Sequence, residues 1–178
     1  MRFLSGLMLL LPLASPFAQA ELIDEVNDRG ELRVALSADL APFSFKQEGR
    51  LTGFDVELGE LLAKELEVKP SLLITDNDDL LSGVESGKYD VAIVPAALPP
   101  EHEARFDFTE PYSYTYLQSQ VNLSIPFQKG NPAFQASLNK ALQRIKADGR
   151  LAALSQSGWG RIRLSRENHP AAGRGFAH

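Results

Sequence analysis

The chain has 178 residues, no cysteine and a formal net charge of −5 at pH 7. Without cysteine it can form no disulfide and carry no cysteine-linked lipid. Arg2 contributes +1 and residues 161–178, with four arginines and one glutamate, contribute +3, which leaves −9 for residues 21–160. An acidic body of this kind argues against nucleic acid and against anionic membrane lipid as partners.

Residues 1–20 have the layout of a secretory signal peptide. One basic residue, Arg2, precedes an apolar run over 3–13, and small residues follow up to Ala18-Gln19-Ala20, which fits an A-x-A cleavage site. The apolar run is shorter than the roughly 20 residues that span a bilayer. We therefore expect cleavage after Ala20, export to the periplasm and no membrane anchor.

The first half of the remaining chain alternates short apolar runs with amphipathic helical patterns. Strands are predicted at 31–36, 69–75 and 89–95, helices at 54–66 and from 78 to Gly87, and a loop or hairpin at 41–55. The apolar stripe of the first helix consists of Phe54, Leu58, Leu61 and Leu62. Alternation of strand and helix predicts an α/β fold, in which a mainly parallel sheet has helices on both faces.

The second half begins with residues 112–128, which are rich in aromatic and β-branched side chains and predict extended chain. A helix is expected over 131–149, with Asn131 as its N-cap and Pro132 in its first helical position. A last short helix is expected within 150–160.

The domain organisation is simple. The sequence has no internal repeat and no linker that would divide residues 21–160, which are therefore predicted to form one lobe. The tail at 161–178 is rich in Arg, Gly and Pro and is predicted to be disordered. A basic docking tail is the alternative.

Four stretches of the chain resemble one family. They are LRVALSADLAPFSFKQEGRLTGFDVELGELLAKEL, LLSGVESGKYDVAI, RFDFTEPYSY and KGNPAFQASLNKALQRIKADGRLAAL. In order and spacing they are similar to the bacterial extracytoplasmic solute-binding proteins of amino-acid ABC transporters. The resemblance implies the type II periplasmic binding protein fold, in which two α/β lobes close on a ligand, and it implies a small polar solute and an ABC permease as partners.

The first departure from the family is the length available for a second lobe. The resemblance implies that this lobe lies between the TEPY segment and the KGNP helix, where this chain has only residues 113–128. A domain usually needs at least about 50 residues. We therefore expect a single lobe whose two crossover strands are joined directly, as a hairpin around Val121-Asn122.

The second departure concerns the residues that contact the ligand. The resemblance implies one aromatic residue near the Pro-Phe pair, a second after the second strand, and then hydroxyl groups and an arginine that grips the α-carboxylate. The matching residues here are Leu40, Asn77, and then Pro95, Ala97, Pro99 and His102. A mostly neutral imidazole cannot replace a guanidinium–carboxylate pair, and proline has no N–H to donate. The usual amino-acid site is therefore predicted to be lost.

Two more candidates follow the first strand. Asp39 and Phe43 lie at the carboxyl edge of the predicted sheet, where open α/β folds bind ligands. In the alternative, Phe43 packs the loop onto the sheet and Asp39 caps a turn. The candidate ligand-binding residues are thus Asp39, Leu40, Phe43, Asn77, Ala97 and His102.

Neither a metal site nor a catalytic motif is predicted. His102 lies between two glutamates, but adjacent side chains point in different directions and a metal needs three or four converging ligands. The acidic stretch 76–79 lacks the oxygen ligand and the glycine of a calcium loop, so we expect a helix N-cap at Asp78 or Asp79. Because the sequence has no G-x-S-x-G motif and no phosphate loop, we predict no enzymatic activity and no cofactor.

Two functional interpretations remain open. In the first, the protein is a periplasmic solute-binding-like protein that no longer grips amino acids in the usual way. In the second, it is an interaction or accessory module for another periplasmic protein, or an inactive remnant, and binds no solute. A lone lobe would leave a strand edge within 112–125 uncovered, and pairing of that edge in a homodimer or with a partner would rebuild a two-walled site.

Overall fold

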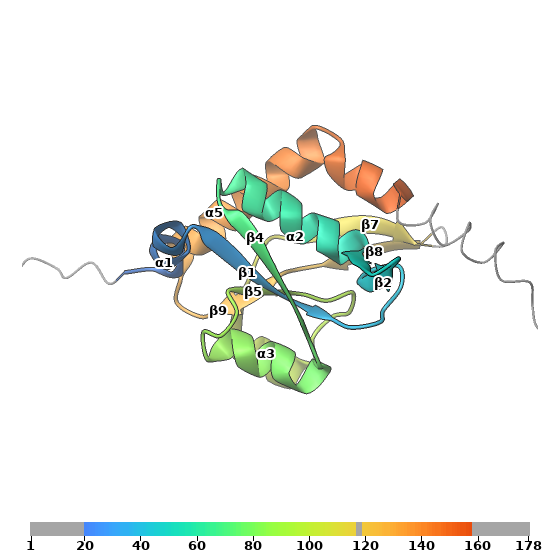
Figure 1. Ribbon diagram of the computed structural model, residues 1–178. Coiled ribbons are helices and arrows are strands. Elements are labelled where there is room, and N and C mark those ends of the chain that lie inside the picture. The colour runs from blue at the N-terminus through green and yellow to red at the C-terminus, as the bar shows by residue number, and fades with distance from the viewer. Residues whose placement is uncertain (1–19, 117–118, 158–178) are drawn as a thin grey trace, which may run out of the picture.

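The computed structural model describes residues 20–116 and 119–157, so most of the predicted signal peptide and the predicted tail lie outside the described residues. A five-stranded sheet with the order β4-β1-β5-β9-β6 forms the centre (Figure 1). Its strands are β1 (Glu31–Ser37), β4 (Lys69–Thr75), β5 (Val91–Ile93), β6 (Phe106–Phe108) and β9 (Pro126–Gln128).

Strands β4, β1 and β5 run parallel, with Leu36 of β1 opposite Ile74 on one side and Ile93 on the other. Strand β9 is antiparallel to both β5 and β6, so it is the one reversed strand of this sheet. The prediction of a mainly parallel sheet is confirmed. The carboxyl ends of β4, β1 and β5 meet at one edge, here called the carboxyl edge, and the opposite edge is called the amino edge.

Helices cover both faces of the sheet, as predicted. They are α1 (Leu22–Arg29), α2 (Phe54–Glu65), α3 (Asn77–Glu85), α4 (Pro100–Glu103) and α5 (Pro132–Ala147), and residues 150–157 are also helical. Helices α2 and α5 lie on one face and α3 on the other (Figure 1). Val34 and Leu36 point into the core under α2 and α5, whereas Ala35 points toward α3, because side chains alternate along a strand.

Between β6 and β9 the chain forms a hairpin of β7 (Tyr112–Tyr116) and β8 (Ser119–Leu123). The predicted hairpin is therefore present, but the prediction that it turns around Val121-Asn122 is wrong. Val121 pairs with Tyr114 inside the ladder, and the chain reverses between β7 and β8. The physical reason is that a β-branched residue such as Val121 favours a strand over a turn. A second hairpin, of β2 (Phe45–Gln47) and β3 (Arg50–Thr52), precedes α2.

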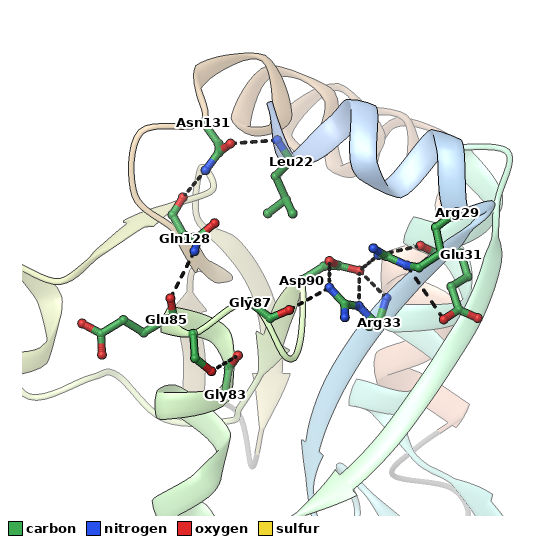
Figure 2. A network of polar contacts seen from close by, with 11 residues as sticks. Leu22, Arg29, Glu31, Arg33, Gly83, Glu85, Gly87, Asp90, Gln128 and Asn131 are labelled. Carbon is green, nitrogen blue, oxygen red and sulfur yellow. Dashed lines mark hydrogen bonds and ion pairs between the residues drawn. The ribbon is translucent and has the colours of Figure 1, made fainter. Parts of the chain in front are cut away.

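An ion-pair network holds the amino edge together (Figure 2). The side chain of Asp90 is 0% exposed and pairs with Arg29, at the end of α1, and with Arg33 of β1. Its Oδ1 accepts from Arg33 Nη2 at 2.9 Å, and its Oδ2 accepts from the backbone N–H of Arg33 at 2.7 Å. Both carboxylate oxygens therefore have donors, which a buried charge needs.

Helices α1 and α5 stabilise each other's first turns. Asn131 Oδ1 accepts from the backbone N–H of Leu22 at 2.8 Å, and a carboxylate oxygen of Glu21 accepts from the N–H of Ala133 at 2.6 Å. Asn131 is the N-cap residue of α5, as predicted, but its side chain makes no capping hydrogen bond to that helix. The cap comes from Glu21 instead, because the start of α1 docks against the start of α5.

Candidate functional site

The loop at 38–53, between β1 and α2, carries Asp39, Leu40 and Phe43. Leu40 N donates to Ser44 O at 2.7 Å and Ser44 N donates back to Leu40 O at 2.9 Å, which closes a tight turn. Phe43 packs against the core under α2, whereas Leu40 is 39% exposed. The turn therefore directs Phe43 inward and leaves Leu40 at the carboxyl edge.

The start of α2 fixes the other end of this loop. Phe54 N donates to Pro42 O at 3.0 Å and Asp55 N donates to Phe43 O at 2.8 Å. Gly53 has a φ of 127°, and a Cβ at this position would lie 2.2 Å from Phe43 O. Only glycine allows the loop to approach the helix so closely.

A hollow of about 280 Å³ lies at the carboxyl edge. Three of the six predicted residues meet there: Leu40 from the loop after β1, Asn77 from the start of α3, and Ala97 from the segment after β5. The full lining is Ser37, Leu40, Asn77, Leu80, Leu81, Val94, Pro95, Ala96, Ala97, Leu98 and Pro99. We call it the carboxyl-edge hollow. It forms where the ends of neighbouring parallel strands meet, which is where open α/β sheets bind ligands.

Several polar groups of the carboxyl-edge hollow are hydrogen-bond donors. Ser37 Oγ donates to Asn77 Oδ1 at 2.9 Å, which directs the amide nitrogen of Asn77 away from Ser37. Neither this nitrogen nor the backbone N–H of Ala96, Ala97 or Leu98 donates to another residue in the part of the chain that the structure describes. A ligand in the hollow could therefore accept hydrogen bonds from these groups.

The carboxyl-edge hollow is electrically neutral within but acidic around its rim. None of its lining residues, all within the described ranges, carries a charge. The charged residues next to them in the chain are acidic: Asp39, Asp76 and Asp78 are exposed, and Asp79 pairs with Lys88. Like charges gathered at one edge make the local potential negative. This arrangement disfavours an anionic ligand.

A second hollow, of about 460 Å³, shares Ala96, Ala97 and Leu98 with the first. Its other lining residues are Glu103, Phe108, Asn122, Leu123 and Ser124, so it opens toward the β7–β8 hairpin. We call it the crossover hollow. The two hollows together make the carboxyl edge an extended and mainly apolar surface around the segment that follows β5.

The other three predicted residues line neither of these hollows. Asp39 is exposed beside Leu40 and has a φ of 51°. Phe43 packs toward the core, in agreement with the structural alternative for this residue. His102 is half-buried in α4, and its Nδ1 has no hydrogen-bond partner among the described residues. These three are therefore not brought together with Leu40, Asn77 and Ala97.

A buried carboxyl group lies next to the loop. Asp55 is 2% exposed, and burial raises the pKa of its carboxyl group to about 7. Its Oδ1 and the hydroxyl of Ser44 are both buried without a hydrogen-bond partner in the described part of the chain. The backbone N–H of Asp55 donates to Phe43 O, which connects the loop to the start of α2. The Asp55 carboxyl group, with its pKa near neutral, therefore lies where the loop meets the helix.

Ser37 and Leu81 line the carboxyl-edge hollow but were not among the predicted site residues, for different reasons. Ser37 ends β1, and the rule that ligands bind beyond the carboxyl ends of strands could have identified it. Leu81 is an apolar residue of α3, and the sequence around it does not indicate that its side chain lines a hollow. Its role depends on how α3 packs beside the segment after β5.

The described residues contain no group of three or more His, Cys, Asp or Glu side chains that could hold a metal ion. The prediction of an N-cap at Asp78 or Asp79 is wrong, because α3 begins at Asn77 and Asp76 caps it. Asp76 Oδ1 accepts from Asp79 N at 2.8 Å, and the Asp79 carboxylate pairs with Lys88. Within 20–116 and 119–157, no helix has the length and apolar character needed to cross a bilayer.

Comparison with known sequences gives a family match over most of the chain. The profile described as "Bacterial extracellular solute-binding proteins, family 3" matches residues 32–160. L-cystine-binding protein TcyJ of Escherichia coli (strain K12) is 38% identical over 116 residues, which are 65% of this chain and 41% of that protein. Cyclohexadienyl dehydratase of Pseudomonas aeruginosa is 33% identical over 104 residues, 58% of this chain and 39% of that protein. The chain thus spans about two fifths of the length of these relatives.

Solved structures give the same fold. The arginine-bound form of domain 1 from TmArgBP is 31% identical in sequence and superimposes with a TM-score of 0.61. The similarity covers 68% of this chain and 98% of that domain. The predicted fold class, an α/β domain of the type II periplasmic binding protein kind, is therefore confirmed.

Proposed function

The chain belongs to the bacterial extracellular solute-binding proteins, family 3, and we propose that it acts as a single periplasmic lobe that binds a small solute in the carboxyl-edge hollow. Its relation to amino-acid-binding proteins of ABC transporters gives the class of function. The periplasmic location rests on the signal-peptide pattern of residues 1–20, and the single lobe rests on the short hairpin between β6 and β9.

The observation that carries this proposal is the convergence of Leu40, Asn77 and Ala97. These residues are 37 and 20 positions apart along the chain, yet they line one hollow beyond the strand ends. Concave, mainly apolar sites with a few placed polar groups are the usual form of a small-molecule site. The sequence positions that match ligand contacts in the family thus still surround a space that a ligand could enter.

A related domain supports the idea that one lobe is sufficient. The structure of domain 1 from TmArgBP is of an arginine-bound form, and the similarity covers nearly all of that domain. A lobe of this kind can therefore hold a small molecule without a second lobe in the same chain. We propose that the present lobe does so too.

We further propose that the usual amino-acid grip is lost in this chain. His102 stands where the resemblance implies an arginine, and it lines neither the carboxyl-edge hollow nor the crossover hollow. Pro95 and Pro99 line the carboxyl-edge hollow but have no N–H to donate. An α-carboxylate would find neutral donors there and no guanidinium, which is a much weaker set of contacts.

The same proposal implies candidate partners for this chain and bears on whether it is an enzyme. An ABC permease would receive the solute, and a homodimer could supply the missing wall of the site. The absence of enzymatic activity stays a prediction, since one relative in this family is named as a dehydratase.

A second candidate function is favoured by the β7–β8 hairpin. Its two strands pair only with each other among the described strands, so each has an outer edge without a strand partner. Unpaired strand edges are sites where another chain can add a strand. In this alternative the lobe binds another periplasmic protein and needs no solute.

The two functions are separated by a thermal-unfolding screen of the purified chain from Glu21 onward, with size-exclusion chromatography on the same sample. Amino acids, polyamines, small carboxylates, amides and sugars form the panel. A ligand at about 100 times its dissociation constant adds about 2.7 kcal/mol to the free energy of unfolding, a shift of several degrees. A hit supports solute binding, whereas no hit together with a discrete dimer supports the interaction module.

A pair of variants locates the site. Ala97→Trp should fill the carboxyl-edge hollow and abolish the shift produced by any hit, because Ala97 lines that hollow. Ala104→Trp places the same side chain at an exposed position that lines neither hollow, and it should leave the shift unchanged. Equal effects of the two variants would show that the solute binds elsewhere.

A further inference from the structure

We propose that the carboxyl-edge hollow selects an uncharged, largely aliphatic ligand that carries a hydrogen-bond acceptor, such as a carboxamide, over amino acids and carboxylates. This inference rests on the proposed function, because it names the ligand class of the same site. Three independent properties of the hollow support it: its walls, the direction of its polar groups, and the charges around it.

The side chains that line the hollow favour a small ligand that is mainly apolar. Leu40, Leu81 and Val94 contribute aliphatic side chains from three different segments of the chain, and alanine and proline supply much of the rest. The volume of about 280 Å³ lies just below the roughly 300–1,000 Å³ of typical ligand sites. A branched aliphatic group of a few carbon atoms would fill the hollow and remove its walls from water.

The hydrogen-bond donors of the hollow favour a ligand that carries an acceptor. The hydroxyl of Ser37 is engaged with Asn77 Oδ1, so Asn77 presents its amide nitrogen as a donor. The backbone N–H groups of 96–98 are also donors without partners among the described residues. A carbonyl oxygen on the ligand can accept from these donors, whereas an ammonium group has no acceptor and leaves them unmatched.

The charges in and near the hollow disfavour a ligand whose acceptor is anionic. A carboxylate taken out of water needs a positive partner or several strong donors, and the hollow has no cation among its described lining residues. Asp76 and Asp78 flank Asn77 in the chain, and Asp39 precedes Leu40. These exposed carboxylates make the potential near the hollow more negative, which disfavours an anion but not a neutral carbonyl group.

The test uses three compounds with one carbon skeleton: 4-methylpentanamide, 4-methylpentanoate and L-leucine. Each is titrated into ¹⁵N-labelled protein at neutral pH, and the dissociation constant is measured from the amide signals of residues 96–98. We expect the amide to bind at least about tenfold more tightly than the carboxylate and the amino acid. Different apolar side chains on the amide would then refine the size of the preferred ligand.

A conservative variant tests the role of the donor. Asn77→Asp replaces the amide nitrogen by a carboxylate oxygen of almost the same size, and it should weaken binding of 4-methylpentanamide about tenfold or more. Asn27→Asp makes the same change at an exposed position of α1, on the amino edge, and should leave the dissociation constant unchanged. Equal losses in both variants would contradict the role given to Asn77.

The outcomes distinguish this inference from the proposed function. If 4-methylpentanoate or leucine binds as tightly as the amide, the ligand class is wrong while solute binding stands. If none of the three binds but another compound of the wider panel does, the ligand class is again overturned. If nothing in the panel binds, the proposed function fails and this inference fails with it.

Discussion

Two aspartates in this protein are buried to the same degree but stand in opposite surroundings. Asp90, at the amino edge, is 0% exposed and receives hydrogen bonds from Arg33 while it pairs with Arg29 (Figure 2). Asp55, where the loop at 38–53 joins α2, is 2% exposed, and its side chain forms no hydrogen bond within the described part of the chain. Burial alone therefore does not determine what a carboxyl group contributes.

The difference indicates which end of the lobe is built for stability and which for function. At the amino edge, charges are compensated and the elements are tied together. At the carboxyl edge, the structure retains a glycine in a conformation that side chains rarely adopt, a carboxyl group without partners and donors without acceptors among the described residues. Uncompensated features of this kind gather at sites that bind or react, because the fold tolerates their cost only where they are used.

The largest expected effect is that of Asp90→Asn. The substitution keeps the shape of the side chain but removes the anionic partner that Arg29 and Arg33 share, and leaves Arg29 with the more distant Glu31. Loss of one member of a buried pair costs about 3–5 kcal/mol. Urea unfolding should therefore show a large fall in the free energy of unfolding, whereas Arg105→Ala, which removes the exposed pair with Glu85, should change it little. A small effect of Asp90→Asn would mean that the network is solvated rather than buried.

Asp55→Asn should instead raise the free energy of unfolding at neutral and alkaline pH. The folded pKa of Asp55 is raised to about 7, above the unfolded value near 3.9. Between these two values the unfolded chain has released this proton and the folded chain retains it, so this group makes stability fall as pH rises from about 4 to 7. Asp55→Asn should remove this fall, which is on the order of 4 kcal/mol at most.

The measurement is a series of urea unfolding curves from about pH 4 to pH 8 for the wild type and for Asp55→Asn. At the alkaline end the variant should be the more stable of the two, and near pH 4 the two proteins should be similar. Asp28→Asn, at an exposed position of α1, serves as the matched control. Parallel pH profiles for all three proteins would contradict the assignment of the pH dependence to Asp55.

Gly53→Ala should have the next largest effect on the free energy of unfolding, because Gly53 lets the loop approach the start of α2 closely. A Cβ would lie 2.2 Å from Phe43 O, and the φ of 127° is strained for any side chain. We expect a loss of about 2 kcal/mol, measured by thermal unfolding. Gly49→Ala also introduces a side chain at a positive φ but meets nothing within 4 Å, so it should cost less. Equal losses would mean that φ alone, and not the contact with the loop, requires glycine at 53.

Much of the fold could be predicted because its signals are local. The apolar run at Lys69–Thr75 gives β4 with the predicted ends, and the apolar stripe of α2 identifies its buried face. The network around Asp90 could not be predicted, because its partners lie 57 and 61 positions away in the chain. Nothing near Asp90 in the sequence distinguishes it from an exposed aspartate.

The meeting of three candidate residues also has a local basis. Leu40, Asn77 and Ala97 were named from the family resemblance, and each of them follows a strand, so all three lie at the carboxyl edge and line one hollow. Phe43 and His102 satisfy the same positional rule but lie away from the hollow, because their directions depend on a tight turn and on a four-residue helix. Side-chain direction in irregular chain depends on such contacts, which sequence patterns do not encode.

The smallest expected effect concerns the neutral contact of the amino edge. Asn131→Ala removes the acceptor for Leu22 N and also the donor to Gln128 O, and a net loss of about 1 kcal/mol is typical for such contacts. Hydrogen exchange should show that the first turn of α1 opens more often while the sheet stays protected, since the ion pairs of Asp90 hold the other end of α1. If α1 and β1 instead lost protection together, the neutral contact and the ion-pair network would be one cooperative unit.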